Sequence, residues 1–123
     1  MPSIAPWLAV SSAREALAYY QTAFGVVELE RLEDEAGDVL IAHLAIDGAD
    51  FWIQADAASS PEALKGSSVR MILTVDEPDV VFARAVAAGA SEVVPMSNSH
   101  GWRIGRVADP CGHHWEIGRR LGA

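Results

Sequence analysis

Hydrophobic and polar positions along the chain follow two different periods, and the order in which these periods occur is repeated. Alternating apolar and polar positions predict a β-strand, whereas apolar residues three and four apart predict an amphipathic helix. In the first half, strands are expected at residues 4–10, 27–32, 39–46 and 49–55. A helix is expected between the first two strands, starting at a capping box from Ser12 to Glu15 and ending at Gly25. Its apolar face carries Ala16, Leu17, Tyr20 and Phe24.

The second half repeats this order after a linker. Residues 56–68 are rich in alanine, serine, proline and glycine and follow neither period, apart from a short helical turn expected at 61–64. Strands are then expected at residues 69–75, 92–96, 102–108 and 113–118. A helix with Asp76 as its N-cap and Pro78 in its first turn should follow the first of these strands and end at Gly89. Residues 97–101 are expected to form a loop that acts as a mobile lid, anchored by Trp102.

The repeat predicts an α+β fold in which two βαβββ modules form a curved eight-stranded mixed sheet around a cavity. Each module has a helix on only one face of its sheet, so the other face must be covered or must line something. A ferredoxin-like arrangement is the alternative, although it does not need three consecutive strands for each helix. Strand parity assigns these residues to the helix side: Leu8, Val10, Met71, Leu73, Val75, Trp115 and Ile117. The opposite parity assigns these to the cavity side: Ala5, Trp7, Ala9, His43, Trp52, Gln54, Arg70, Ile72, Thr74, His114 and Glu116.

Composition narrows the classes of function. The net charge of −8 argues against a nucleic-acid partner, because phosphate binding depends on clustered Lys and Arg. The chain has no run of about 18 apolar residues that could span a membrane, and its first residues do not form a secretory signal. A single cysteine, Cys111, cannot form an internal disulfide and fits a reducing compartment. We therefore expect a cytoplasmic location and neither a nucleic-acid nor a membrane partner.

The most distinctive stretch is residues 99–120, SHGWRIGRVADPCGHHWEIGRR, in which two strands flank an Asp-Pro-Cys-Gly turn. This stretch resembles the end of a vicinal-oxygen-chelate domain, the superfamily of glyoxalase I, bleomycin-resistance proteins and extradiol dioxygenases. Its sequence is most similar to that of the PhnB-like branch, in which an aromatic residue occupies the position of Cys111. The resemblance implies a single glyoxalase-like domain over residues 1–123, made of two repeats at about 1–58 and 68–120. It implies a fold more directly than a reaction.

The resemblance also implies where a metal would bind. In metal-dependent members, the first and last strands of each module supply the ligands of a divalent ion. By strand register, these positions are Ala5, Trp52 or Gln54, Arg70 and Glu116. Only Glu116 is a good ligand, because alanine has no donor atom and arginine is a permanent cation. We therefore expect no metal or other cofactor, and we expect Arg70 and Glu116 to form an ion pair inside the second half of the cavity.

The tryptophan content is also notable, because this short chain contains four tryptophan residues. An indole ring stacks well on planar or cationic molecules. The residues predicted to bind a ligand are Trp7, His43, Trp52, Gln54, Arg70, His100, Trp102, His114 and Glu116.

Three functions remain open. The first is a metal-independent small-molecule binding protein, similar to members that sequester drugs or toxins, with an aromatic or cationic ligand. The second is a metal-dependent lyase or isomerase of the glyoxalase type, with Glu116 as base or ligand. The third is a protein whose own side chains fill the cavity. We also expect a homodimer, because superfamily members commonly complete the cavity with strands from a second chain.

Overall fold

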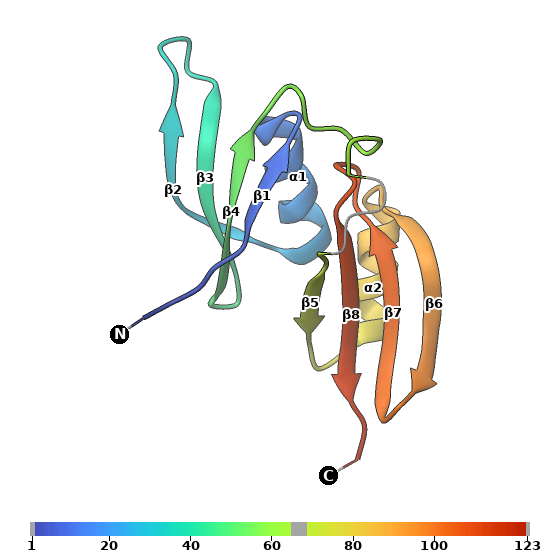
Figure 1. Ribbon diagram of the computed structural model, residues 1–123. Coiled ribbons are helices and arrows are strands. Elements are labelled where there is room, and N and C mark those ends of the chain that lie inside the picture. The colour runs from blue at the N-terminus through green and yellow to red at the C-terminus, as the bar shows by residue number, and fades with distance from the viewer. Residues whose placement is uncertain (1, 65–68, 123) are drawn as a thin grey trace.

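The computed structural model describes residues 2–64 and 69–122 and contains two βαβββ modules (Figure 1). The first module consists of β1 (Trp7–Val10), α1 (Ala13–Phe24), β2 (Val27–Glu33), β3 (Val39–Ile46) and β4 (Ala49–Ala55). The second consists of β5 (Met71–Thr74), α2 (Pro78–Ala87), β6 (Ser91–Ser99), β7 (Trp102–Ala108) and β8 (His114–Arg120). The predicted α+β class and the repeated order of one strand, one helix and three strands are confirmed, and this order excludes the ferredoxin-like alternative.

Each module has its own four-stranded mixed sheet. The strand orders are β1-β4-β3-β2 and β5-β8-β7-β6, so the first strand of each module lies at an edge beside the last one. These first and last strands are parallel, with Leu8 beside Ile53 and Leu73 beside Ile117, and the other pairs are antiparallel. Both helices lie behind the sheets in Figure 1. The face of each sheet turned away from its helix is therefore open.

The helix ends follow the sequence signals more closely in the first module than in the second. The Ser12 hydroxyl accepts a hydrogen bond from the Glu15 backbone N–H at 3.2 Å, as the capping box predicts. The second helix instead begins after Glu77, so the predicted cap at Asp76 is wrong. Pro78 explains the difference, because its fixed φ starts the helix directly at that residue. Neither helix in the described part of the chain is long and apolar enough to cross a membrane.

The loop predicted at residues 97–101 is wrong, because strands occupy most of this range. β6 continues to Ser99, where it pairs with Trp102, and only His100 and Gly101 form the turn. Their φ angles of 51° and 83° are both positive, which suits a tight hairpin turn between twisted strands. Almost all of β6 is exposed, so its sequence lacks the alternation that marks a half-buried strand. The predicted mobile lid is therefore replaced by a two-residue hairpin turn.

The linker and the first strand also differ in extent from the sequence prediction. β1 begins at Trp7 rather than at residue 4, which leaves Ala5 outside the sheet. A helical turn occurs at residues 61–64, as predicted, and the Leu64 N–H donates to the Ser60 carbonyl at 3.1 Å. Residues 65–68 of the predicted linker lie outside the described residues.

The two modules share one core, in which α1 and α2 pack against each other. Aromatic rings from both modules meet there, with Phe24 of α1 4.7 Å from Trp115 of β8 between ring centroids. Tyr20 and Phe51 approach the same cluster, and their centroids are 5.5 Å apart. The strand parity read from the sequence correctly predicted which strand residues face the core. Of the residues assigned to the helix side, Leu8, Val10, Leu73, Trp115 and Ile117 are buried, and Met71 and Val75 are half-buried.

Asp109, in the turn before β8, has a buried carboxylate that also joins the modules. One oxygen, Oδ2, accepts hydrogen bonds from the Tyr20 hydroxyl at 2.6 Å and the Trp115 indole N–H at 2.9 Å. The other, Oδ1, accepts from the backbone N–H groups of Cys111 and His113 at 2.9 and 3.0 Å. Burial, together with Asp109, raises the pKa of Tyr20 well above its usual range, so this hydroxyl remains a donor. Burial also raises the pKa of the Cys111 thiol to about 12, which keeps it neutral and unreactive.

Candidate functional site

A row of stacked rings crosses the open face of the first sheet. Register places Trp7 of β1 beside Trp52 of β4, Trp52 beside His43 of β3, and His43 beside Glu30 of β2. The two indoles stack with centroids 5.9 Å apart and planes 21° apart, and the imidazole lies 4.0 Å from the Trp52 ring at 6°. Trp7, Trp52 and His43, called the aromatic row below, form a stack of three rings in which the imidazole covers one face of the Trp52 indole and Trp7 is the most exposed ring.

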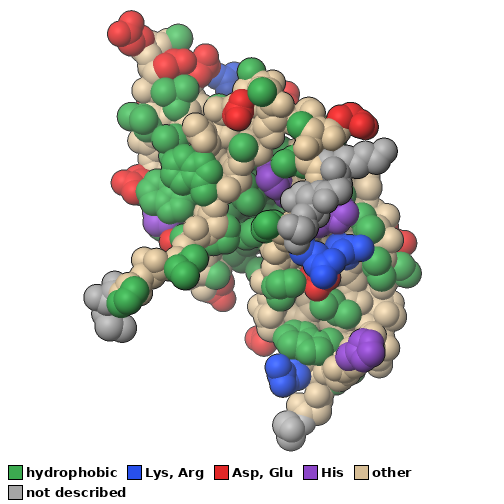
Figure 2. Space-filling view, viewed as in Figure 1, with side chains coloured by type: hydrophobic (Ala, Val, Ile, Leu, Met, Phe, Trp, Pro, Cys, Tyr) green, Lys and Arg blue, Asp and Glu red, His purple; other side chains and the backbone are tan. Residues whose placement is uncertain are grey.

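Polar groups hold the aromatic row in place and give it an acidic margin. The His43 Nε2 atom lies 2.8 Å from an oxygen of Asp50, and its Nδ1 atom lies 3.8 Å from an oxygen of Glu30. The Trp7 indole N–H donates to the side-chain oxygen of Gln54 at 2.9 Å. Figure 2 shows hydrophobic side chains gathered on this face, with acidic side chains at its outer margin. A planar molecule can stack here, and a positive charge on it would meet nearby carboxylates.

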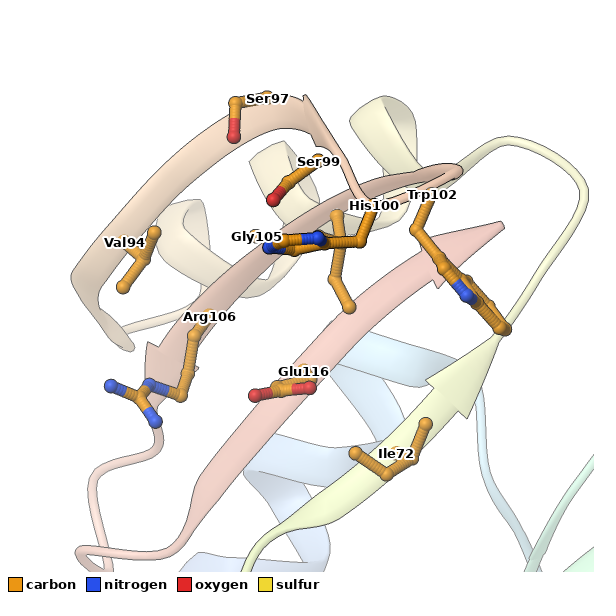
Figure 3. Close-up of a pocket in the computed structure, with 10 residues that line it drawn as sticks. Ile72, Val94, Ser97, Ser99, His100, Trp102, Gly105, Arg106 and Glu116 are labelled. Atoms are coloured by element: carbon orange, nitrogen blue, oxygen red, sulfur yellow. The ribbon is translucent and has the colours of Figure 1, made fainter. Parts of the chain in front are cut away.

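A pocket of about 500 Å³ lies on the open face of the second sheet. It is lined by Ile72, Val94, Ser97, Ser99, His100, Trp102, Ile104, Gly105, Arg106 and Glu116 (Figure 3). Register places four of these residues in one row across β6, β7, β8 and β5, namely Val94, Arg106, Glu116 and Ile72. The pocket therefore combines an apolar lining with a few charged and hydroxyl-bearing side chains, as small-molecule sites usually do.

Glu116 is paired with a cation at the side of this pocket. The Arg70 Nε atom lies 3.0 Å from Glu116 Oε1, which confirms the predicted ion pair. Arg70 immediately precedes β5, whose parallel neighbour is β8, so the guanidinium reaches Glu116 diagonally across the two strands. The Glu116 side chain is 22% exposed and that of Arg70 is 48% exposed. The pair is thus partly solvated, and its contribution to stability is correspondingly small.

The residues at the superfamily's metal positions do not fit a divalent ion. Ala5 has no donor atom, and the Gln54 oxygen already accepts a hydrogen bond from Trp7. Glu116 is held by Arg70, whose positive charge would repel a metal. Within residues 2–64 and 69–122, no group of three or more His, Cys, Asp or Glu side chains could hold one. Metal affinity in such sites depends on several convergent ligands, which are lacking here.

The structure divides the predicted ligand-binding residues between three places. Trp7, His43, Trp52 and Gln54 lie together on the first sheet, as described above. His100, Trp102 and Glu116 line the pocket on the second sheet, with Arg70 at its side. His114 lines a different pocket of about 430 Å³ beside the linker.

Sequence reasoning missed several pocket residues, of which Arg106 is the most informative. Arg106 and Ile104 have the same strand parity as Trp102, whereas Gly105 and Val107, which have the opposite parity, are buried. This alternation in β7 was the available signal. Ser97 and Ser99 were missed for another reason, because they had been assigned to a loop.

One family model and several known proteins match this chain. A family model described as a glyoxalase-like domain matches residues 7–118. Protein Mb0911c of Mycobacterium bovis is 36% identical over 126 residues, which cover 96% of this chain and 83% of that protein. The solved structure of TioX from Micromonospora sp. ML1 has a TM-score of 0.77 and 26% identity, covering 98% of this chain and 100% of TioX. The PhnB protein from Bacillus cereus shares the fold, with a TM-score of 0.72 and 18% identity over 98% of this chain and 100% of that one.

Proposed function

Because the chain belongs to the glyoxalase-like family of the vicinal-oxygen-chelate superfamily, we propose that it is a metal-independent small-molecule binding protein. The resemblance to the family that residues 99–120 suggested is confirmed by the family model, and the PhnB protein shares the fold. The proposed role is binding alone, as in members of the superfamily that sequester drugs or toxins. Such a role requires a cavity and contacts but no catalytic group.

The aromatic row is the observation that supports this proposal most directly. Trp7 is 51% exposed although it is a large apolar side chain, and its ring continues the stack of Trp52 and His43. Burying such a surface against a planar ligand is favourable, and the carboxylates of Asp50 and Glu30 beside His43 favour a positive charge. We therefore propose an aromatic or cationic ligand for the first sheet.

We further propose that two copies of the chain enclose the ligand between them. The open face of the first sheet exposes the apolar side chains of Trp7, Val27 and Leu32, and that of the second sheet exposes Ile72. The first face has the carboxylates beside His43, whereas the second has Arg70 and Arg106, so the two faces are complementary in charge. A two-fold axis that places the first sheet of one copy opposite the second sheet of the other would cover both faces.

The proposal can be tested with N-methylquinolinium, a planar aromatic cation, and its neutral parent quinoline as probes. Binding should quench tryptophan fluorescence and raise the melting temperature, because a ligand that binds only the folded state stabilises it. Trp52→Ala should lower the affinity by about tenfold, since it removes the middle ring of the stack. Val80→Ala changes an exposed side chain on α2 and serves as the control. Unchanged affinity in Trp52→Ala, or no binding of either probe, contradicts the proposal.

Metal analysis discriminates between this function and the lyase or isomerase alternative. The proposal predicts that EDTA leaves the affinity for the probes unchanged. A stoichiometric divalent ion that is lost in Glu116→Ala would instead support a glyoxalase-type enzyme with Glu116 as its ligand.

A further inference from the structure

Arg106, at one end of the second-sheet pocket, has a positive charge without a partner among the side chains that the structure describes. Its Nε atom is buried and makes no hydrogen bond. No hydrogen bond or ion pair involves its guanidinium within the described residues, 2–64 and 69–122. Buried donors in folded proteins are nearly always paired. This exception indicates a position that a bound molecule completes.

Glu116 is the obvious candidate partner, and the geometry explains why it does not neutralise Arg106. The two residues are directly opposite each other in the register of β7 and β8. The Glu116 carboxylate is, however, engaged by Arg70, whose Nε lies 3.0 Å from Oε1. Among the described residues, Glu116 is the only acidic one that lines the pocket. The second-sheet pocket is therefore locally positive on a chain whose net charge is −8.

We infer that the second-sheet pocket binds an organic anion, with a carboxylate or phosphonate headgroup on Arg106. A guanidinium donates two parallel hydrogen bonds to either oxyanion, and such charge-assisted bonds are stronger than neutral ones. The hydroxyls of Ser97 and Ser99 line the same pocket farther from Arg106, where they can donate to polar groups on the rest of the ligand. The inference rests on the proposed small-molecule binding, but it concerns the second sheet rather than the aromatic row.

The rest of the pocket specifies the body of that anion. Arg106 lies at one end of the pocket and Trp102 at the other, with Glu116 and Ile72 along the floor (Figure 3). Apolar surface from Val94 and Ile104 completes the lining. Because the apolar groups lie beside the guanidinium, the pocket fits an acid with a hydrocarbon or aromatic body better than it fits inorganic phosphate.

Three probes of similar size test this inference. Phenylacetate and phenylphosphonate carry the two headgroups, and phenylacetamide is the neutral counterpart. Titration calorimetry of the wild-type protein should give an affinity for at least one anion that exceeds the affinity for phenylacetamide by about tenfold or more. Comparing the two anions identifies the headgroup. Equal affinity for all three probes would overturn the inference.

Substitutions locate the effect at Arg106. Arg106→Gln should abolish the preference for the anion, whereas Arg119→Gln should keep it, because Arg119 is exposed on β8 with the parity of the core-facing Trp115 and Ile117. Glu116→Gln should strengthen anion binding, since it removes the negative charge beside the site and releases Arg70. A preference for the anion that survives in Arg106→Gln contradicts the inference.

Two measurements keep the outcomes distinct. The melting temperature of Arg106→Gln should not fall below that of the wild type, because the substitution removes a buried donor that has no partner. A lower melting temperature would mean that Arg106 has a structural role, and it would count against the inference. Binding of N-methylquinolinium and its loss in Trp52→Ala report on the proposed function separately. If these persist while the anion preference is absent, only the anion site is overturned.

Discussion

Asp109 connects two modules whose described strands form separate hydrogen-bonded sheets. Its Oδ2 atom accepts hydrogen bonds from the Tyr20 hydroxyl and the Trp115 indole N–H. Tyr20 belongs to α1 of the first module, and Trp115 belongs to β8 of the second. A buried carboxylate is stable only when hydrogen bonds replace the water that it has lost. The four donors around Asp109 meet this requirement, and the Tyr20 hydroxyl among them comes from the other module and so links the two.

Tyr20→Phe tests this dependence. The substitution keeps the ring in the core but removes one donor from a buried charge, so the free energy of unfolding should fall by about 1–3 kcal/mol. Tyr19→Phe is the matched control, because the Tyr19 hydroxyl also joins the modules but donates to a neutral acceptor, the Ala85 carbonyl, at 3.1 Å. Urea denaturation should show the larger loss for Tyr20→Phe. An equal or smaller loss would mean that the hydroxyl of Tyr20 adds little to the stability of the Asp109 carboxylate.

For single residues, the sequence was most informative where parity and register were both clear. Arg70 and Glu116 could be paired in advance because they lie on strands that must be neighbours in a strand-helix-three-strand module. The stack of Trp7, Trp52 and His43 could only be assigned to one face, because ring contacts depend on the lateral register of three strands. The unpartnered state of Arg106 was also hidden, since it depends on which arginine takes the Glu116 carboxylate.

At the scale of elements, local signals decided where helices and turns begin. Ser12 and Pro78 each mark a helix start by a physical mechanism that acts within a few residues. β6 was truncated in the prediction because its last three residues, 97–99, are polar and exposed and have no periodic pattern. Its continuation to Ser99 follows from pairing with β7, and such pairing is not visible in the strand's own sequence.

The turn between β7 and β8 provides a test at this scale, through Gly112→Ala. Gly112 has φ of 97°, and a Cβ there would lie 2.7 Å from the Cα of Pro61 in the linker. Gly37 has a similar φ of 87° but an added Cβ would meet nothing within 4 Å, so Gly37→Ala measures the backbone strain alone. Gly112→Ala should be the less stable variant by about 1–3 kcal/mol, because the linker backbone must move. Equal stabilities in urea denaturation would show that the linker adapts without loss.

The whole molecule has two open sheet faces, one acidic at its margin and one with Arg70 and Arg106. If two copies cover these faces, light scattering at micromolar concentration should give twice the chain mass of 13.1 kDa. Trp7→Asp should shift the protein toward the monomer, because it places a charge in an apolar contact. Val80→Asp, on the exposed side of α2, should remain dimeric. A wild-type mass of one chain would rule out the proposed shared cavity.

The parallel pairing of the first and last strands in each module also determines when the molecule can become complete during synthesis. The first module can close its sheet once Ala55 has left the ribosome, but β5 neighbours only β8 in its sheet. The core-facing ring of Phe24 likewise cannot pack against Trp115 until β8 has been synthesised. Long-range pairing of this kind leaves apolar surface uncovered on the nascent chain, where chaperones and aggregation compete for it. Apolar surface of the nascent chain therefore stays uncovered from the emergence of α1 until that of β8.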